Sequence, residues 1–200
     1  MDGAIFVEPE HAVTLEPQRI GIPSVVLDDV PVDNIGGAKA LAAHLHGLGH
    51  RRVALVGGPA DDLHASARLE GIRLVYPDTV WLAGDWGAES GYRLTAQALE
   101  LGVTAILGAN DFNALGVLRA LYGLGLSAPL HISVTGFDDA PLAQFFAPPL
   151  TTVRQPLERQ GERAVRALLD KLEGRPVNAP VTEALEIVIR DSTGPPTRSV

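Results

Sequence analysis

The sequence has no cysteine among its 200 residues, which excludes disulfide bonds, thiolate metal sites and a cysteine nucleophile. Aromatic residues are few, at 5%, but the hydrophobic fraction of 46% is enough for a sizeable core in one large domain or two small lobes. Lys and Arg number only 16 against 24 Asp and Glu, giving a net charge of −8. Because phosphate binding needs a basic surface, we expect any contact with DNA to come from outside these residues.

Long hydrophobic runs are also lacking. No segment approaches the roughly 18 to 20 apolar residues of a membrane span. The opening MDGAIFVEPE lacks the basic start and apolar middle of a signal peptide. We therefore expect a cytoplasmic protein with no membrane partner.

Short runs rich in Val, Ile and Leu alternate with longer amphipathic segments, a pattern typical of parallel strands joined by crossover helices. This predicts an α/β fold with strands within residues 3–8, 24–29, 51–58, 79–85, 104–110, 131–138, 150–155 and 185–191. Helices are predicted at about 34–48, 63–75, 88–101, 112–124 and 157–172. Glycines suited to left-handed C-caps follow four of these helices, at Gly49, Gly102, Gly125 and Gly174. In the fourth helix, three- and four-residue spacing predicts a core face made of Leu115, Leu118, Leu121 and Tyr122.

Polar residues stand at the ends of the predicted strands, where open α/β sheets bind their ligands. They are Asp28-Asp29, Gly57-Gly58-Pro59, Gly84-Asp85-Trp86, Asn110-Asp111 and Asp138-Asp139. Any one Asp or Asn could be an ordinary helix cap or turn residue. Five polar strand ends together favour a binding site.

Arg68 lies on the helix that follows the Gly-Gly-Pro loop. It is either a solvated charge or a planar donor that grips vicinal hydroxyls or a carboxylate. Trp86 could pack in the core or offer its ring face to a sugar. Together with Asn110 and Asp138 in one crevice, these residues would suit a polyhydroxylated ligand.

Other kinds of chemistry find less support. His44 and His46 lie two residues apart on a predicted helix, hence on opposite sides, so we predict no metal site. There is no nucleophile elbow, P-loop or dinucleotide motif, and we expect no cofactor. Asp138 and Asp139, as neighbours on a strand, would point to opposite faces and make a poor catalytic pair. We therefore predict a non-enzyme with no catalytic residues.

Several longer motifs resemble one family when taken in order. They are HLHGLGHRRVALVGGP, the run from Ser66 to Gly71, GDW followed by ESGY, ANDFNALGVLRAL, and VTGFDDAPLAQFFAPPLTTVRQP. From about Gly3 to Thr193 the chain resembles the effector-binding core of LacI/GalR-type transcriptional regulators, which is similar to type I periplasmic sugar-binding proteins. The same fold occurs in solute-binding proteins of transport systems, which is the alternative interpretation.

The resemblance implies a two-lobed parallel-sheet fold whose effector, a small molecule and most simply a carbohydrate, binds between the lobes. It implies effector contacts at Asp28, Arg68, Trp86, Asn110 and Asp138, with Gln155 near a crossing between lobes, and it assigns Asp139 to a turn or cap. It also implies a homodimer that reaches operator DNA through a headpiece.

The same resemblance divides the chain into a remnant of the N-terminal lobe (1–30), the C-terminal lobe (31–153), a return segment to the N-terminal lobe (154–191) and a loose tail (192–200). The headpiece and the first βα units of the family have no counterpart in these residues. The segment between Gly71 and the GDW motif is shorter than is usual in the family.

Overall fold

The structure is a computed structural model that describes residues 2–6, 21–26, 32–177 and 182–197. The chain forms two compact units, which are described separately. The smaller unit contains Met1–Asp33 and Pro156–Ala184, and the larger contains Asn34–Gln155 and Leu185–Val200. Among the helices described, none is both long and apolar enough to cross a membrane.

The larger unit is built on a parallel sheet, as predicted. Its strands lie in the order β4-β3-β5-β6, with bounds Val80–Leu82, Val53–Val56, Ala105–Gly108 and Ser133–Thr135. The two central strands, β3 and β5, are buried along their whole length, because helices cover both faces of a parallel sheet. A separate antiparallel pair consists of β7 (Thr152–Arg154) and β8 (Glu186–Val188).

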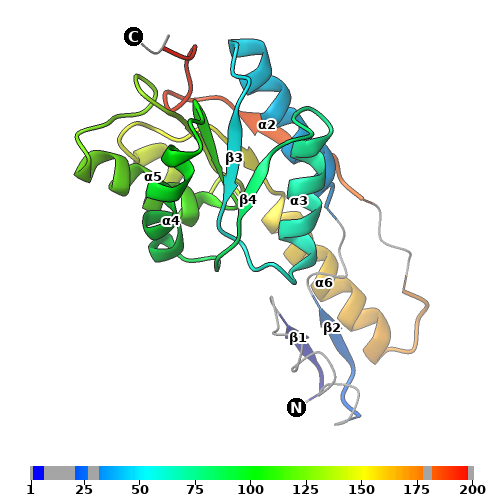
Figure 1. The fold of residues 1–200 in the computed structure, drawn as a ribbon. Helices are drawn as coiled ribbons and strands as arrows, with labels where there is room; N and C mark the ends of the chain where they lie inside the picture. Colours follow the sequence, from blue (N-terminus) through cyan, green and yellow to red (C-terminus); the bar gives the residue numbers. More distant parts are fainter. Residues whose placement is uncertain (1, 7–20, 27–31, 178–181, 198–200) are drawn as a thin grey trace. The chain divides into compact units, whose positions relative to one another are not determined.

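Two pairs of helices flank this sheet (Figure 1). On one face, α2 (Asn34–Leu48) packs beside α3 (Leu63–Arg73), and on the other α4 (Ala88–Glu100) packs beside α5 (Asp111–Gly123). Each pair closes its own hydrophobic cluster against the strands. The predicted helices are therefore confirmed, with ends that differ by no more than two residues.

Glycine allows α4 and α5 to pack closely. A Cβ atom added to Gly116 of α5 would overlap the carbonyl oxygen of Ala88, and one added to Gly91 of α4 would overlap that of Asn113. Because both obstacles are backbone atoms, neither helix could hold a larger residue there without moving. This packing fixes the start of α5, where Asn110 and Asp111 lie.

The smaller unit contains β1 (Ala4–Phe6) paired in parallel with β2 (Ser24–Val26), and α6 (Leu157–Leu172) contacts both strands. The Nζ of Lys171, in the last turn of α6, donates to the carbonyl oxygen of Ser24 at 2.6 Å. Arg159 and Arg163, near its start, pair with the carboxylate of Glu183. The first contact joins the N-terminal strands to α6, and the ion pairs join α6 to the residues that follow it.

Two details of the sequence prediction are wrong. Tyr122 is 79% exposed, although Leu118 and Leu121 are buried, because one helical step of about 100° turns Tyr122 away from the sheet.

The tail is not loose at Ser192, which is fully buried. Its hydroxyl donates to the Val134 carbonyl oxygen at 2.6 Å, and its own carbonyl oxygen accepts from the Val134 N–H at 2.9 Å. Residues 198–200 lie outside the described part.

The segment predicted to return as one piece, 154–191, is divided between the two units. Residues 156–184 belong to the smaller unit, whereas β8 belongs to the larger, where it pairs with β7. The glycine caps behave as predicted, since Gly49, Gly102, Gly125 and Gly174 all have positive φ.

Candidate functional site

Arg68 lies in α3, whose start is fixed by the side chain of Asp62. The Asp62 carboxylate caps the helix by accepting hydrogen bonds from two backbone N–H groups, at 2.7 and 2.9 Å. Arg68, in the second turn, is only 6% exposed. A guanidinium buried to this extent needs several partners, because burying a charge without them is costly.

The partners of Arg68 come from distant parts of the larger unit. Its Nε donates to the side-chain oxygen of Asn34 at 2.9 Å, and its Nη1 donates to the carbonyl oxygen of Ala109 at 2.6 Å. Its Cζ lies 3.9 Å from the ring centroid of Phe137 and 5.2 Å from that of Trp86. The guanidinium is thus held by hydrogen bonds in its plane and by aromatic rings at its faces.

Asp138 completes this cluster. Its Oδ1 lies 3.5 Å from Nη2 of Arg68 and accepts a hydrogen bond from Nε2 of Gln155 at 2.7 Å. The Asp138 side chain keeps 28% of its surface exposed, in contrast to 7% for that of Arg68. The structure therefore brings together three of the predicted site residues, Arg68, Asp138 and Gln155, and leaves the carboxylate partly open.

The backbone from Gly136 to Ala140 bends away from the regular strand to form the turn that presents Asp138, although Asp138 itself still makes an isolated parallel bridge with Arg154. β6 ends at Thr135, and both Asp138 (φ 116°) and Asp139 (φ 56°) have positive φ. Such values are uncommon for non-glycine residues, but the Asp138 N–H donates to the Val153 carbonyl oxygen at 2.8 Å and supports the turn. The two acids do reach different partners, but strand alternation was the wrong reason to expect it.

Asp139 is more than a turn or cap residue. Its carboxylate accepts from Arg190 at 2.6 Å and from Arg154 at 2.7 Å. Burial pushes the pKa of Asp139 upward, but the hydrogen bonds and positive charges of the two arginines outweigh it and leave the pKa lowered. Asp139 therefore joins β7 and the segment after β8 by ion pairs.

Asn110 caps α5. Its side-chain oxygen accepts from the backbone N–H of Asn113 at 2.8 Å, and its Nδ2 donates to the carbonyl oxygen of Trp86 at 3.1 Å. Trp86 is half-buried, with its ring near the guanidinium of Arg68. Asn110 thus has the ordinary capping role and also joins Trp86 to the cluster. The remaining predicted contact, Asp28, lies outside the described residues.

Sequence reasoning missed Asp111 as an individual residue. This acid is 1% exposed, and its carboxylate accepts from the Thr152 hydroxyl at 2.6 Å and from the Ala140 N–H at 2.7 Å. Burial raises the pKa of Asp111 to about 7, opposed by these two hydrogen bonds and reinforced by the negative charges of Asp138 and Asp139. Sequence reasoning also missed Asn34, which is the first residue of α2, and Phe137, which directly precedes the predicted contact Asp138.

The cluster offers donors and acceptors for hydroxyl groups. A guanidinium and a carboxamide each lie within hydrogen-bonding distance of a partly exposed carboxylate, and an indole ring lies beside the guanidinium. Within the part of the chain described, no three His, Asp or Glu side chains are arranged to hold a metal ion.

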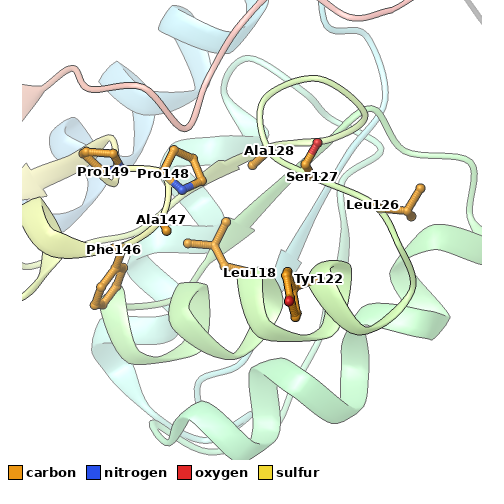
Figure 2. Close-up of a pocket in the computed structure, with 9 residues that line it drawn as sticks. All are labelled: Leu118, Tyr122, Leu126, Ser127, Ala128, Phe146, Ala147, Pro148 and Pro149. Atoms are coloured by element: carbon orange, nitrogen blue, oxygen red, sulfur yellow. The ribbon is translucent and has the colours of Figure 1, made fainter.

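A second feature of the larger unit is apolar. A cavity of about 480 Å³ opens between α5 and the residues before β7 (Figure 2). It is lined by Leu118, Tyr122, Leu126, Ser127, Ala128, Phe146, Ala147, Pro148 and Pro149. In the segment that leads to Phe146, Leu142 and Phe145 are 58% and 76% exposed. An open apolar cavity with a largely exposed aromatic residue in its lining, here Tyr122, marks an interaction site more often than an ordinary solvated face.

Comparison with known proteins places this geometry in a family. The periplasmic binding protein-like domain family matches residues 42–193. The HTH-type transcriptional regulator MalR of Streptomyces coelicolor is 34% identical, over 96% of this chain and 64% of its own length. The lactose operon repressor of Escherichia coli is 33% identical, over 94% of this chain and 56% of its own length. The chain thus spans somewhat more than half the length of these curated relatives.

Solved structures agree. A LacI family regulator from Enterococcus faecium with bound ribose superposes with a TM-score of 0.86 at 27% identity, covering 98% of this chain and 81% of the other. The CelR–cellobiose complex gives 0.85 at 28% identity, covering 96% and 66%. The lac repressor dimer bound to operator gives 0.80 at 32% identity, covering 97% and 74%.

These proteins are transcriptional regulators, not enzymes, and they confirm the resemblance carried by the sequence motifs. The chain belongs to the periplasmic binding protein-like domain family, and it corresponds to the effector-binding core of LacI-family regulators.

Proposed function

We propose that this chain binds a sugar effector through Arg68, Asp138 and Gln155, with Trp86 and Asn110 completing the site. The observation that carries the proposal is the pairing of a buried guanidinium with a partly exposed carboxylate at 3.5 Å. Ionised donors and acceptors make the strongest hydrogen bonds to hydroxyl groups, and an indole face suits the apolar side of a sugar ring. Asp28 remains a predicted contact of the same site.

The sugar-bound relatives support this choice of ligand, since one solved structure holds ribose and another cellobiose. We propose further that the chain senses its sugar for a cytoplasmic transcriptional regulator and acts on operator DNA through a headpiece outside these residues. The relatives reported above are regulators, so the alternative of a solute-binding protein for transport is not favoured.

The sugar site can be tested by calorimetry and NMR shift mapping with a panel of ribose, glucose, maltose, lactose and cellobiose. Removing a hydrogen bond to a charged group costs about 1.5–3 kcal/mol, so we expect Asp138→Ala to weaken binding of the best sugar by roughly 10- to 100-fold. Asp78→Ala removes an exposed acid of the same unit and should leave the affinity unchanged. Equal affinities for the wild type and Asp138→Ala would refute this site.

We propose that the apolar surface around Tyr122, Leu142 and Phe145 is the contact between two copies of the chain. Tyr122, which is 79% exposed, lines the cavity together with apolar groups that include Leu118 and Phe146 (Figure 2), and Phe145, next to Phe146 in the sequence, is 76% exposed. The dimeric lac repressor structures support a second copy as the occupant.

Analytical ultracentrifugation tests this interface. Tyr122→Asp would place a charge on the apolar surface and should convert dimers into monomers. Leu74→Asp, a matched change at a 60% exposed leucine at the end of α3, should leave the dimer intact. A Tyr122→Asp protein that stays dimeric would show that another surface mediates association.

A further inference from the structure

Asp111 connects three separate segments of the larger unit through one carboxyl group. It is the first residue of α5, its Oδ1 accepts from the Thr152 hydroxyl of β7, and its Oδ2 accepts from the Ala140 N–H. Ala140 directly follows Asp138 and Asp139, the two acids with positive φ. The carboxyl group thus holds the far end of the turn that presents Asp138.

The near end of the same turn is shaped around Asp111 as well. The backbone N–H of Asp111 donates to the Phe137 carbonyl oxygen at 2.9 Å. A Cβ atom added to Gly136 would overlap Oδ1 of Asp111, so a residue without a side chain is needed there. The turn from Gly136 to Ala140 is therefore packed and hydrogen-bonded to Asp111 at both ends.

We propose that Asp111 is the positioning residue of the sugar site, and that its carboxyl group holds the turn in the conformation that directs Asp138 toward the ligand. This inference rests on the proposed function for the identity of the ligand. Asp111 is fully buried, so its part is to support Asp138 and not to touch the sugar.

Protonation of Asp111 changes the strength of this support. Since burial raises the pKa of Asp111 to about 7, the carboxyl group exchanges its proton in the neutral range. In the ionised form both oxygens accept charge-assisted hydrogen bonds, but the raised pKa means that the cost of burying the charge outweighs them. Because the pKa of Asp111 lies above the ordinary carboxyl value of 3.8, ionisation disfavours the packed turn, which is therefore held more firmly below about pH 7 than above it.

The surrounding charges partly offset one another. Asp138 and Asp139 oppose ionisation of Asp111. Asp138 is paired with Arg68, and Asp139 is paired with Arg154 and Arg190, which limits that repulsion. We therefore expect the affinity for the best sugar of the panel to fall about fivefold between about pH 6 and about pH 8.

Two variants separate positioning from a merely structural role. Asp111→Asn keeps an amide oxygen for the Ala140 N–H and an NH₂ group for the Thr152 hydroxyl, but it cannot titrate. Its sugar affinity should be independent of pH and close to that of the wild type at about pH 6. Thr152→Val removes a hydrogen bond that lowers the pKa of Asp111, so it should shift the midpoint of the pH profile upward. Asp78→Asn, at an exposed acid, should reproduce the wild-type profile.

NMR provides a readout that needs no sugar. The amide resonance of Ala140 should titrate near pH 7 in the wild type, and this transition should be absent in Asp111→Asn and shifted in Thr152→Val. If no sugar of the panel binds the wild type, the proposed function fails, but the Ala140 titration still tests how Asp111 holds the turn. An Ala140 resonance that does not titrate in the wild type, or a sugar affinity with the same pH dependence in Asp111→Asn, would overturn the proposal.

Discussion

Replacing Arg68 by methionine is expected to destabilise the larger unit strongly, because the side chain is buried and holds distant segments together. Methionine fills the space of the aliphatic stem but supplies no donor. The side-chain oxygen of Asn34 and the carbonyl oxygen of Ala109, which now accept at 2.9 and 2.6 Å, would lose their partner. The ring of Phe137, at 3.9 Å from Cζ, would lose its cation.

The magnitude follows from these contacts. Two unpaired buried acceptors cost about 1–2 kcal/mol each, and the cation–π contact adds about 1 kcal/mol. The pair with Asp138 adds little, since it is long, at 3.5 Å, and the carboxylate is partly exposed. Relief from burying a charge offsets part of the sum, so we expect a loss of about 3 kcal/mol in the free energy of unfolding.

Urea unfolding followed by tryptophan fluorescence measures this loss in the relevant unit, because both tryptophans of the chain, Trp81 and Trp86, belong to the larger unit. Arg119→Met is the matched control at an exposed position of α5 and should change stability by less than about 0.5 kcal/mol. A loss of less than about 1 kcal/mol for Arg68→Met would refute the reasoning, since the buried acceptors would then have found other donors.

Three further changes test other contacts by the same denaturant assay. Asp139→Asn should destabilise the protein at neutral pH, because the folded pKa of Asp139 is lowered. The difference in free energy of unfolding between this variant and the wild type should shrink as pH falls below the usual carboxyl value of 3.8, and a constant difference would contradict this. Burial lowers the pKa of His50, so the wild type should lose stability as pH falls below 6.5, and His50→Gln should flatten that dependence. Gly116→Ala should cost several kcal/mol through its backbone overlap, whereas Gly47→Ala, with open space in α2, should stabilise by up to about 1 kcal/mol; equal effects would refute the packing argument.

The helices could be predicted because their signals are local. Two helices begin and end at the predicted residues, namely Asn34–Leu48 and Leu157–Leu172. In each, the apolar spacing indicates the helix, and a glycine with positive φ, Gly49 or Gly174, follows its end. Tyr122 shows the limit of that method. Apolar spacing identifies a helix face, but it does not show where the buried part of that face ends around the helix, and Tyr122 lies one helical step beyond it.

The site was predictable only in part, for a physical reason. The strand-end rule singles out Asp138 and Asn110 from the local pattern. Asp111 accepts its hydrogen bond from Thr152, which is 41 residues away in the sequence. The acceptors of Arg68, Asn34 and Ala109, are 34 and 41 residues away from it. No local pattern encodes such distances. The positive φ of Asp138 could not be predicted either, because positive φ is expected at glycine and not at aspartate.

The adjacent acids Asp138 and Asp139 illustrate how one turn can separate a binding task from a structural one. Asp139 accepts short hydrogen bonds from two arginines at 2.6 and 2.7 Å, so most of its charge is already compensated within the fold. Asp138 lies 3.5 Å from the guanidinium of Arg68 and retains more than a quarter of its side-chain surface. A carboxylate that keeps exposed surface remains accessible to a ligand hydroxyl, whereas one with only 9% of its side chain exposed does not. The positive φ values of the turn are what send the two neighbouring carboxylates to such different surroundings.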